Sequence, residues 1–305
     1  MRKKTARKSL IIMLAIVITI AMMPTMAFAE KVNGGGSGNS CGANLTWSFE
    51  NGTGTLTITG DGTAMDNYTV GDGVASTAPW YTDRLNIRSV VIEAANLTNI
   101  GSFAFKECIN LTTVTLPNSV KTIGDEAFNG CTSLVMVMMP KVETIGVNAF
   151  RGCFKLETVI MSEVKTISGG VFAECKALTS AIMPVATTIG DYAFKNCTKL
   201  KSAVIKNGCA IGKEAFTGVA AGVKLYVLGG DSLTGDGAES VKSYKKVATK
   251  QTNPETLYKA DGGMEFDTSD NSLKWTGNCG KATVEDSLKW TLDTEGTLTI
   301  TGDGT

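Results

Sequence analysis

A single motif recurs along the middle of the chain at an almost constant spacing. Each copy reads Ile-Gly-x-x-Ala-Phe with few changes, and successive phenylalanines lie 23 residues apart once and 22 residues apart four times. Such a period, with apolar letters in phase and polar letters free to vary, predicts a solenoid whose coils bury their apolar sides against one another. The phenylalanines expected in its core are Phe105, Phe128, Phe150, Phe172, Phe194 and Phe216.

Two positions of the motif have one exception each. Glycine follows the isoleucine in five of the six copies, and Ser168 takes its place in the other. Alanine precedes the phenylalanine in five copies, and Val171 does so in the sixth. We expect the glycine to allow a tight turn and the alanine to allow close packing, with this half of the coil forming a short helical turn.

Cysteine follows the phenylalanine by three residues in the first five copies. Equivalent residues of parallel coils stack about 4.8 Å apart with side chains pointing the same way, whereas a disulfide needs two side chains that point at each other. A disulfide series or a stack of metal ligands is the alternative in an exported protein. We interpret these residues as a buried ladder of small apolar side chains: Cys108, Cys131, Cys153, Cys175 and Cys197.

The segment between two motifs has the pattern of a short strand. Leu134, Val137 and Met139 follow an L-x-x-V-x-M spacing whose last positions alternate, and prolines such as Pro117, Pro140 and Pro184 come next. Proline cannot continue a hydrogen-bonded ladder, so it closes the strand. The predicted fold class is therefore an α/β repeat solenoid, with short parallel strands on one face and short helical turns or loops on the other.

Alternation along these strands also predicts an apolar strip on the outer face of the sheet. If Val137 and Val159 point inward, the residues that follow them point outward, and four adjacent coils place apolar side chains there. A contiguous exposed apolar strip marks a binding surface, although a flanking segment could also pack over it, or β propensity alone could select these residues. The strip, with one flanking methionine, is Met136, Met138, Ile160, Ile182 and Val204.

The N-terminus has the form of a secretory signal peptide. Basic residues precede an apolar run from Leu10 to Met23, and Ala-Phe-Ala ends at Ala29, after which we expect cleavage. Five basic residues leave with this segment, so the remaining 276 residues carry 24 basic and 29 acidic side chains, a formal charge of 24 − 29 = −5. No basic stripe for nucleic acid is present, and no second apolar segment is long enough to cross a membrane.

The flanks of the solenoid carry one module twice. An alternating pattern on both sides of an Asn-Gly turn predicts a β-hairpin in 41–63, and 288–305 repeats it as LKWTLDTEGTLTITGDGT. Because that copy stops at the end of its hairpin, we expect a longer protein. The predicted organisation is 1–29 signal peptide, 30–40 Gly/Ser-rich linker, 41–84 β-rich cap, 85–228 solenoid of about six coils, 229–250 capping helix region, 251–278 linker and 279–305 a truncated second cap.

The phrase TIGDEAFNGCTSLVMVMMP at 122–140 resembles the BspA-type leucine-rich repeat, also called the Treponema-type or LRR_5 class. The resemblance covers about residues 85–228. It implies a curved, right-handed solenoid with a parallel sheet along one face, and for the family it implies surface display and binding to host or neighbouring-cell macromolecules. It implies no catalysis. No cofactor is expected.

The residue types agree with a protein that is not an enzyme. The chain has no histidine, which excludes Ser-His-Asp and Cys-His nucleophiles and any zinc site with an imidazole ligand. The Asp- and Gly-rich stretches match no calcium-loop spacing and are better explained as turns, so no metal is expected. The acidic residues Asp125, Glu126, Glu143, Glu157, Glu163, Asp191 and Glu214 fall at different phases of the repeat, so no glycosidase pair is imposed.

The function predicted from these features is non-catalytic binding of a host or neighbouring-cell protein or glycan by a secreted or cell-surface, adhesin-like protein. One alternative is a structural spacer within a larger surface protein. Another is a non-catalytic appendage of an exported hydrolase. The pattern does not set the oligomeric state.

Overall fold

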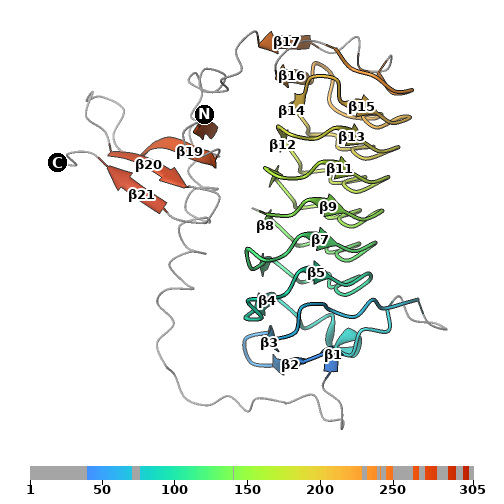
Figure 1. The fold of residues 1–305 in the computed structure, drawn as a ribbon, viewed down its shortest axis with the longest axis vertical. Helices are drawn as coiled ribbons and strands as arrows, with labels where there is room; N and C mark the ends of the chain where they lie inside the picture. The colour runs from blue at the N-terminus through green and yellow to red at the C-terminus, as the bar shows by residue number, and fades with distance from the viewer. Residues whose placement is uncertain are drawn as a thin grey trace.

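The chain forms a stack of repeated coils with a β-rich module at its N-terminal end (Figure 1). The computed structural model describes residues 40–70, 76–139, 141–228, 232–238, 241 and 245–249, and the backbone of four further strands between 264 and 301. The predicted signal peptide, 1–29, and nearly all of the predicted linker, 30–40, lie outside the described residues. Within the described part the solenoid has parallel strands and about six turns, as the repeat predicts.

One strand of each coil joins a sheet of 11 strands, in the order β1-β2-β3-β4-β6-β8-β10-β12-β14-β16-β17. The strands of the coils pair in parallel, and residues one repeat period apart lie side by side. Val159 of β10, for example, lies beside Val137 of β8 and Ala181 of β12. The alternation of apolar and polar residues also predicts which side chains face the core, and inward residues such as Val137 and Val159 are buried as expected. The coil strands are β4 (Ser89–Ile92), β6 (Thr113–Thr115), β8 (Met136–Met138), β10 (Thr158–Ile160), β12 (Ser180–Met183), β14 (Ser202–Lys206) and β16 (Lys224–Leu228).

A second parallel sheet was not predicted. It has six strands of two residues each, and in the middle four a threonine faces outward beside a buried isoleucine, as in Thr144 and Ile145. A two-residue strand is too short to show alternation, so the sequence pattern does not reveal it. The strands are β5 (Asn99–Ile100), β7 (Thr122–Ile123), β9 (Thr144–Ile145), β11 (Thr166–Ile167), β13 (Thr188–Ile189) and β15 (Ala210–Ile211).

The predicted short helical turns are not found; the motif half of each coil is a chain of tight turns. Alternate amides bond within the coil, as Asn129 N–H does to the carbonyl of Glu126 at 3.1 Å. The amides between them bond to the next coil, as Phe128 N–H does to Ala149 at 2.8 Å. Residues such as Glu126 accordingly adopt a left-handed φ of 52°. A helix would need every amide for its own i−4 carbonyl, so bonding between coils excludes it.

The N-terminal module continues the solenoid. Its predicted hairpin is present as β2 (Leu45–Glu50) paired antiparallel with β3 (Thr55–Gly60), preceded by β1 (Ser40–Gly42). Strand β3 then pairs in parallel with β4 of the first coil. A short 3₁₀ turn, η1 (Tyr81–Asp83), follows Trp80, whose ring stacks on Phe105 with centroids 5.5 Å apart. The module therefore covers the first phenylalanine with an aromatic ring of its own.

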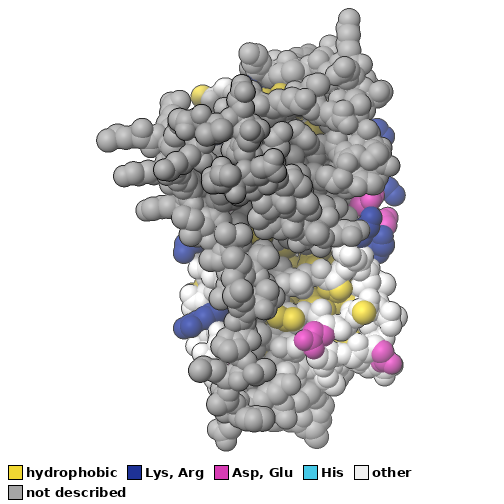
Figure 2. All heavy atoms as spheres, turned by 90° about the vertical axis from the view of Figure 1, so that its left-hand side faces the viewer, with side chains coloured by type: hydrophobic (Ala, Val, Ile, Leu, Met, Phe, Trp, Pro, Cys, Tyr) yellow, Lys and Arg dark blue, Asp and Glu magenta, His cyan; other side chains and the backbone are white. Residues whose placement is uncertain are grey.

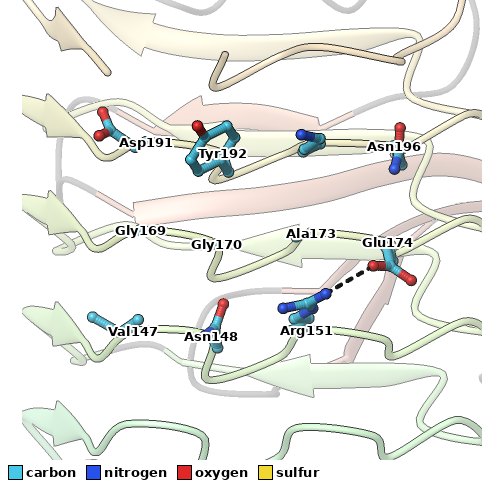
Figure 3. A pocket seen from close by; sticks show the side chains of 11 residues that line it. Val147, Asn148, Arg151, Gly169, Gly170, Ala173, Glu174, Asp191, Tyr192 and Asn196 are labelled. Atoms are coloured by element: carbon cyan, nitrogen blue, oxygen red, sulfur yellow. Dashed lines mark hydrogen bonds and ion pairs between the residues drawn. The ribbon is translucent and has the colours of Figure 1, made fainter. Parts of the chain in front are cut away.

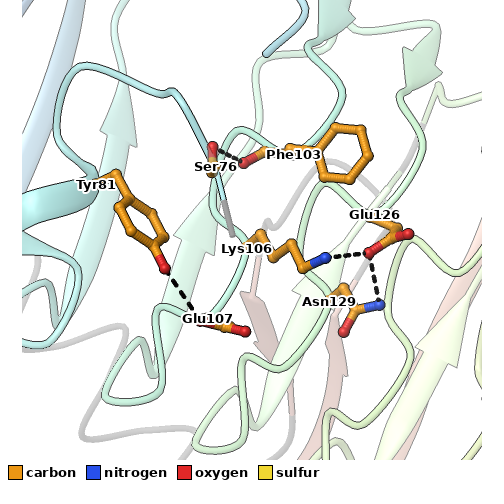
Figure 4. A network of polar contacts seen from close by, with 7 residues as sticks. All are labelled: Ser76, Tyr81, Phe103, Lys106, Glu107, Glu126 and Asn129. Atoms are coloured by element: carbon orange, nitrogen blue, oxygen red, sulfur yellow. Dashed lines mark hydrogen bonds and ion pairs between the residues drawn. The ribbon is translucent and has the colours of Figure 1, made fainter. Parts of the chain in front are cut away.

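Polar contacts join this module to the first coil, and the first coil to the second (Figure 4). The Ser76 hydroxyl donates to the carbonyl of Phe103 at 2.8 Å, and the Tyr81 hydroxyl donates to Glu107 at 3.2 Å. One coil further, Lys106 and Glu126 form an ion pair of 2.6 Å. These bonds satisfy polar groups at the edge of the core where the repeat pattern begins.

Two predictions on the C-terminal side are wrong. In the predicted capping helix region, 229–250, the structure has strand β17 (Lys245–Thr249), which pairs in parallel with β16. A further strand satisfies the backbone groups along the open edge of β16, which a helix would leave unpaired. The linker expected at 251–278 contains β18 (Met264–Asp267) and most of β19 (Ser272–Cys279).

The repeated hairpin is present near the chain end. Strand β20 (Leu288–Leu292) pairs antiparallel with β21 (Leu298–Thr301), and both belong to a four-stranded sheet with β18 and β19. Trp290 lies opposite Ile300, just as Trp47 lies opposite Ile58 in the first copy. The two copies thus share the same cross-strand register.

The core is a continuous column of stacked rings. All six repeat phenylalanines are at most 1% exposed. Their centroids are 5.1–5.6 Å apart and neighbouring planes lie within 18° of parallel. The prediction that letters one period apart become neighbours in space is confirmed.

Candidate binding surface

The predicted apolar strip has the predicted phase but not the predicted exposure. The inward strand residues belong to the main core, whereas Ile182 and Val204 form a separate cluster with Ile160, Tyr226 and Leu228 packed against them. We call these five residues the outer cluster. Ile182 is only 2% exposed and Val204 only 5%, so the expectation of an exposed strip is wrong for both. In-register parallel pairing places each side chain of a column against its neighbours, which shields the middle ones.

The methionines of the strip are placed differently. Met136 is half-buried at the start of β8, and Met138 pairs with Ile160 through the backbone, while its side chain lies outside the described residues. Thr115, the same column position in the first complete coil, is exposed. Among the described side chains, the outer cluster therefore includes residues of the third and later coils and does not include Thr115.

Sequence reasoning missed Tyr226 and Leu228. Both lie on β16, where Tyr226 pairs with Val204 and Leu228 pairs with Lys206. The signal was available, because the alternation in Lys224–Leu228 places Tyr226 in the same column as Val204. Figure 2 shows hydrophobic side chains gathered on the visible part of this side of the molecule, with acidic and basic groups at its margins.

The cysteine ladder is buried, as predicted. Cys108 is 1% exposed and the other four ladder thiols are fully buried. Burial raises the pKa of Cys108 to about 12, with Arg84 opposing the shift, and it raises the pKa of Cys131 well above the ordinary value. Cys41 is also a buried free thiol. Such thiols stay protonated at neutral pH and are poor nucleophiles and poor metal ligands.

The acidic side chains on the coil turns have structural partners. Glu143 lies between Lys121 and Lys165 of the coils on either side, at 3.1 and 3.6 Å. Its hydrogen bond with Lys121 lowers its pKa. Asp125 accepts the backbone N–H of Val147 at 2.7 Å. These carboxylates connect neighbouring coils, and they do not face one another across a cleft.

Among the described residues, no group of three or more His, Cys, Asp or Glu side chains could hold a metal ion. The same part of the chain also has no helix long and apolar enough to cross a membrane. The described solenoid has two kinds of surface, the outer sheet face and the coil turns.

A scan against family models matches residues 81–221 to the BspA type leucine-rich repeat region, in six copies. Residues 81–221 belong to the BspA-type leucine-rich repeat family. The match covers nearly all of the solenoid predicted at 85–228. No curated protein is similar enough to match the chain.

Solved structures similar to the chain include other leucine-rich repeat proteins of bacteria. A leucine-rich repeat protein of T. pallidum is 25% identical, with 58% of this chain and 86% of that chain covered and a TM-score of 0.43. A leucine-rich cell surface protein of Faecalibacterium prausnitzii is 23% identical, with 84% and 60% covered and a TM-score of 0.44. This chain thus spans less than two thirds of the F. prausnitzii protein.

Proposed function

We propose that this chain is a non-catalytic, exported surface protein that binds a protein or glycan of a host or neighbouring cell through the outer face of its large sheet. The observation that carries the proposal is the outer cluster, which lies outside the main core. Apolar side chains gathered on a sheet face away from the core are typical of an interaction surface. The BspA-type region supplies a rigid, non-catalytic scaffold for that surface.

Surface localisation belongs to the same proposal. The basic and apolar character of residues 1–29 supports export, and the Ala-Phe-Ala triplet supports cleavage after Ala29. The F. prausnitzii protein is described as a cell surface protein, which is in keeping with display on a cell. Detecting an N-terminus at Glu30 in protein recovered from the culture medium or cell envelope would test this part.

The contact face is tested by adding charge to it. We expect Ile160→Asp to abolish binding on an array of extracellular-matrix proteins and glycans while leaving Tm nearly unchanged, because Ile160 is only half-buried. Thr115→Asp is the matched control, since Thr115 occupies the same column outside the outer cluster and is exposed. Unchanged binding by the Ile160→Asp protein would overturn the proposed contact face.

The near-complete burial of Ile182 and Val204 favours a second candidate, a structural spacer whose outer face is already covered. Ile182→Asp should cost more than about 2 kcal/mol of stability under either function, because a charge would replace a buried apolar group. Ile160→Asp separates the two functions, since its site is only half-buried. A partner surface would lose binding on the array, whereas a spacer would show no binding for the change to remove.

A further inference from the structure

The fourth coil departs from the repeat at the two positions after its Ser168. Its next residues are Gly169 and Gly170, whereas each of the other five coils carries a side chain at both positions. Gly170 has a left-handed φ of 65°, and the equivalent residues, with φ between 51° and 60°, are not glycine. The backbone therefore does not require glycine here. The equivalent residues are Phe103, Glu126, Asn148, Tyr192 and Glu214.

The spacing between the third and fourth coils is also wider than elsewhere. Ser168 N–H bonds to the carbonyl of Ile145 at 3.4 Å, whereas the same bond in the other described coils is 2.7–2.9 Å. The Phe150–Phe172 distance of 5.6 Å is the longest of the ring stack between repeat phenylalanines. At this position a Cβ approaches the backbone of the preceding coil, so the serine separates the coils where its equivalents are glycine.

These changes leave a notch of about 430 Å³ on the turn side of the solenoid. Figure 3 shows Gly169 and Gly170 at its floor, with Asn148 and Arg151 on the coil below and Tyr192 and Asn196 on the coil above. A volume of this size lies in the range of small-ligand sites, about 300–1,000 Å³. It is large enough for one or two sugar rings.

Three polar side chains of the notch have no partner among the described residues. The side-chain amides of Asn148 and Asn196 and the hydroxyl of Tyr192 have no hydrogen-bond partner within the described part of the chain. An amide offers both a donor and an acceptor, and a phenol can act as either. These groups can therefore bond a ligand with many hydroxyls without first breaking a hydrogen bond within the described part of the protein.

Two backbone donors of the notch are free as well. In two other coils an aspartate from the preceding coil accepts the equivalent N–H, as Asp125 does for Val147 at 2.7 Å and Asp191 does for Lys213 at 2.7 Å. Val147 and Gly169 stand where that aspartate would be, so the N–H groups of Gly169 and Asp191 have no acceptor among the described residues. Both can donate to a ligand oxygen.

The basic side chains beside the notch already have partners. Arg151 pairs with Glu174 at 3.1 Å, and Lys195 pairs with Glu214 at 3.1 Å. The carboxylate of Asp191 accepts a backbone N–H and keeps its negative charge. The lining that is described therefore disfavours an anionic ligand, because neither basic side chain is unpaired.

Tyr192 supplies an aromatic surface. The Lys195 ammonium lies 4.6 Å from the ring centroid and pairs with Glu214 of the following coil. Figure 3 shows the Tyr192 ring beside the notch, on the coil above Gly170, where the fourth coil has no side chain. An aromatic face beside free amides suits a sugar ring, which has apolar C–H surfaces and hydroxyls along its edges.

From this geometry we infer that the notch at Gly169 and Gly170 binds a sugar residue of an uncharged glycan. The sugar ring packs on the aromatic ring of Tyr192. The hydroxyls of the sugar bond with Asn148, Asn196 and the two free N–H groups. The site lies on the coil turns and not on the sheet face, so Ile160→Asp leaves it intact and the two proposals can fail separately.

The test is saturation-transfer NMR on the whole chain with uncharged di- and trisaccharides of glucose, galactose, mannose and N-acetylglucosamine at millimolar concentration. We expect at least one to bind. Gly170→Asn gives the fourth coil the side chain that the preceding coil carries at this position, and its Cβ would displace the Asn148 amide, which stands there now. Tyr192→Ala removes the aromatic ring. Each change should weaken binding about tenfold or more. Uronate-containing and sulfated saccharides form the charged arm and should not bind.

The matched control is Gly208→Asn, because Gly208 also has a left-handed φ, 77°, and nothing lies within 4 Å of a Cβ there. It should bind the saccharide like the original protein. If the Gly170→Asn protein does not fold, the double change Asn148→Ala with Asn196→Ala tests the same site. Absence of binding by every uncharged saccharide, preference for the charged arm, or equal binding by the Gly170→Asn protein would each overturn the inference.

Discussion

The thiol of Cys131 donates a hydrogen bond of 3.1 Å to the carbonyl oxygen of Phe105, one coil earlier. The next three ladder thiols make the same bond to the preceding phenylalanine, at 3.0–3.3 Å. That carbonyl also accepts the N–H that closes its own turn, as Phe105 does from Cys108 at 3.2 Å. Cysteine suits the position because it is small and apolar, yet it can donate to a buried oxygen.

The ladder bond predicts a modest but measurable role in stability. Cys153→Ala should lower the unfolding free energy by about 1–2 kcal/mol, since it removes a buried sulfur atom and one donor. The cost stays moderate because the carbonyl of Phe128 still accepts its hydrogen bond from the N–H of Cys131, at 3.1 Å. Urea unfolding measures the change. Thr198→Ala, at an exposed position beside Cys197, is the control. An equal loss of stability there would contradict the role of the thiol.

The buried thiols also predict a loss of stability in alkali. Burial raises the pKa of Cys108 to about 12, and the pKa values of Cys131 and Cys175 are also well above the ordinary value. The unfolded chain releases these protons near pH 8.5 while the folded chain keeps them, so stability is full below about pH 8.5 and falls as pH rises. Each such thiol contributes about 1.4 kcal/mol per pH unit to the slope.

The slope can be measured by urea unfolding between about pH 7 and about pH 10, a range that includes the ionisation of an ordinary thiol. Cys131→Ala should make it shallower by the share of one thiol. A slope that the substitution leaves unchanged would mean that other groups, such as the buried Tyr68, cause the alkaline loss.

The repeat reveals most of the core but not the local backbone. The phases of Phe128 and Cys131 follow from the period alone, because identical spacing places equivalent residues side by side. Whether the chain between them forms a helix depends on where the amides bond, and neighbouring coils take half of them. The exposure of Ile182 depends equally on what packs over a column, which one coil's pattern cannot show.

The candidate notch illustrates the same limit. The exception at Ser168 is visible in the sequence, as are the two glycines that follow it. Their meaning appears only when the coils are stacked, because a missing side chain creates space only between neighbours that keep theirs. A departure from a repeat is therefore a signal for a site, and the spacing between coils shows whether that site is open.

The ring column predicts a large effect in the middle of the stack. Phe150→Ala should cost about 3–5 kcal/mol, because the ring is fully buried between Phe128 and Phe172. Phe154→Ala, four residues later, removes the same ring from a position that is 41% exposed. It should cost less than about 1 kcal/mol, the contact with Lys176 included. Thermal unfolding of both variants compares them, and similar losses would refute a core made by the ring column.

The glycine that follows each repeat isoleucine predicts a steric effect with a control in the chain itself. In Gly146→Ala the new Cβ would lie 2.6 Å from the backbone nitrogen of Asp125 and 2.7 Å from the carbonyl carbon of Gly124. Backbone atoms cannot swing aside, so the coils should separate, at a cost of about 1–3 kcal/mol. The bond from Gly146 N–H to Ile123, now 2.8 Å, should lengthen toward the 3.4 Å found at Ser168, and amide hydrogen exchange at residue 146 should become faster.

Ser168→Ala keeps a Cβ that the coil already accommodates and should change stability by less than about 0.5 kcal/mol. If both substitutions cost the same, close approach of the coils is not the reason for glycine at this position.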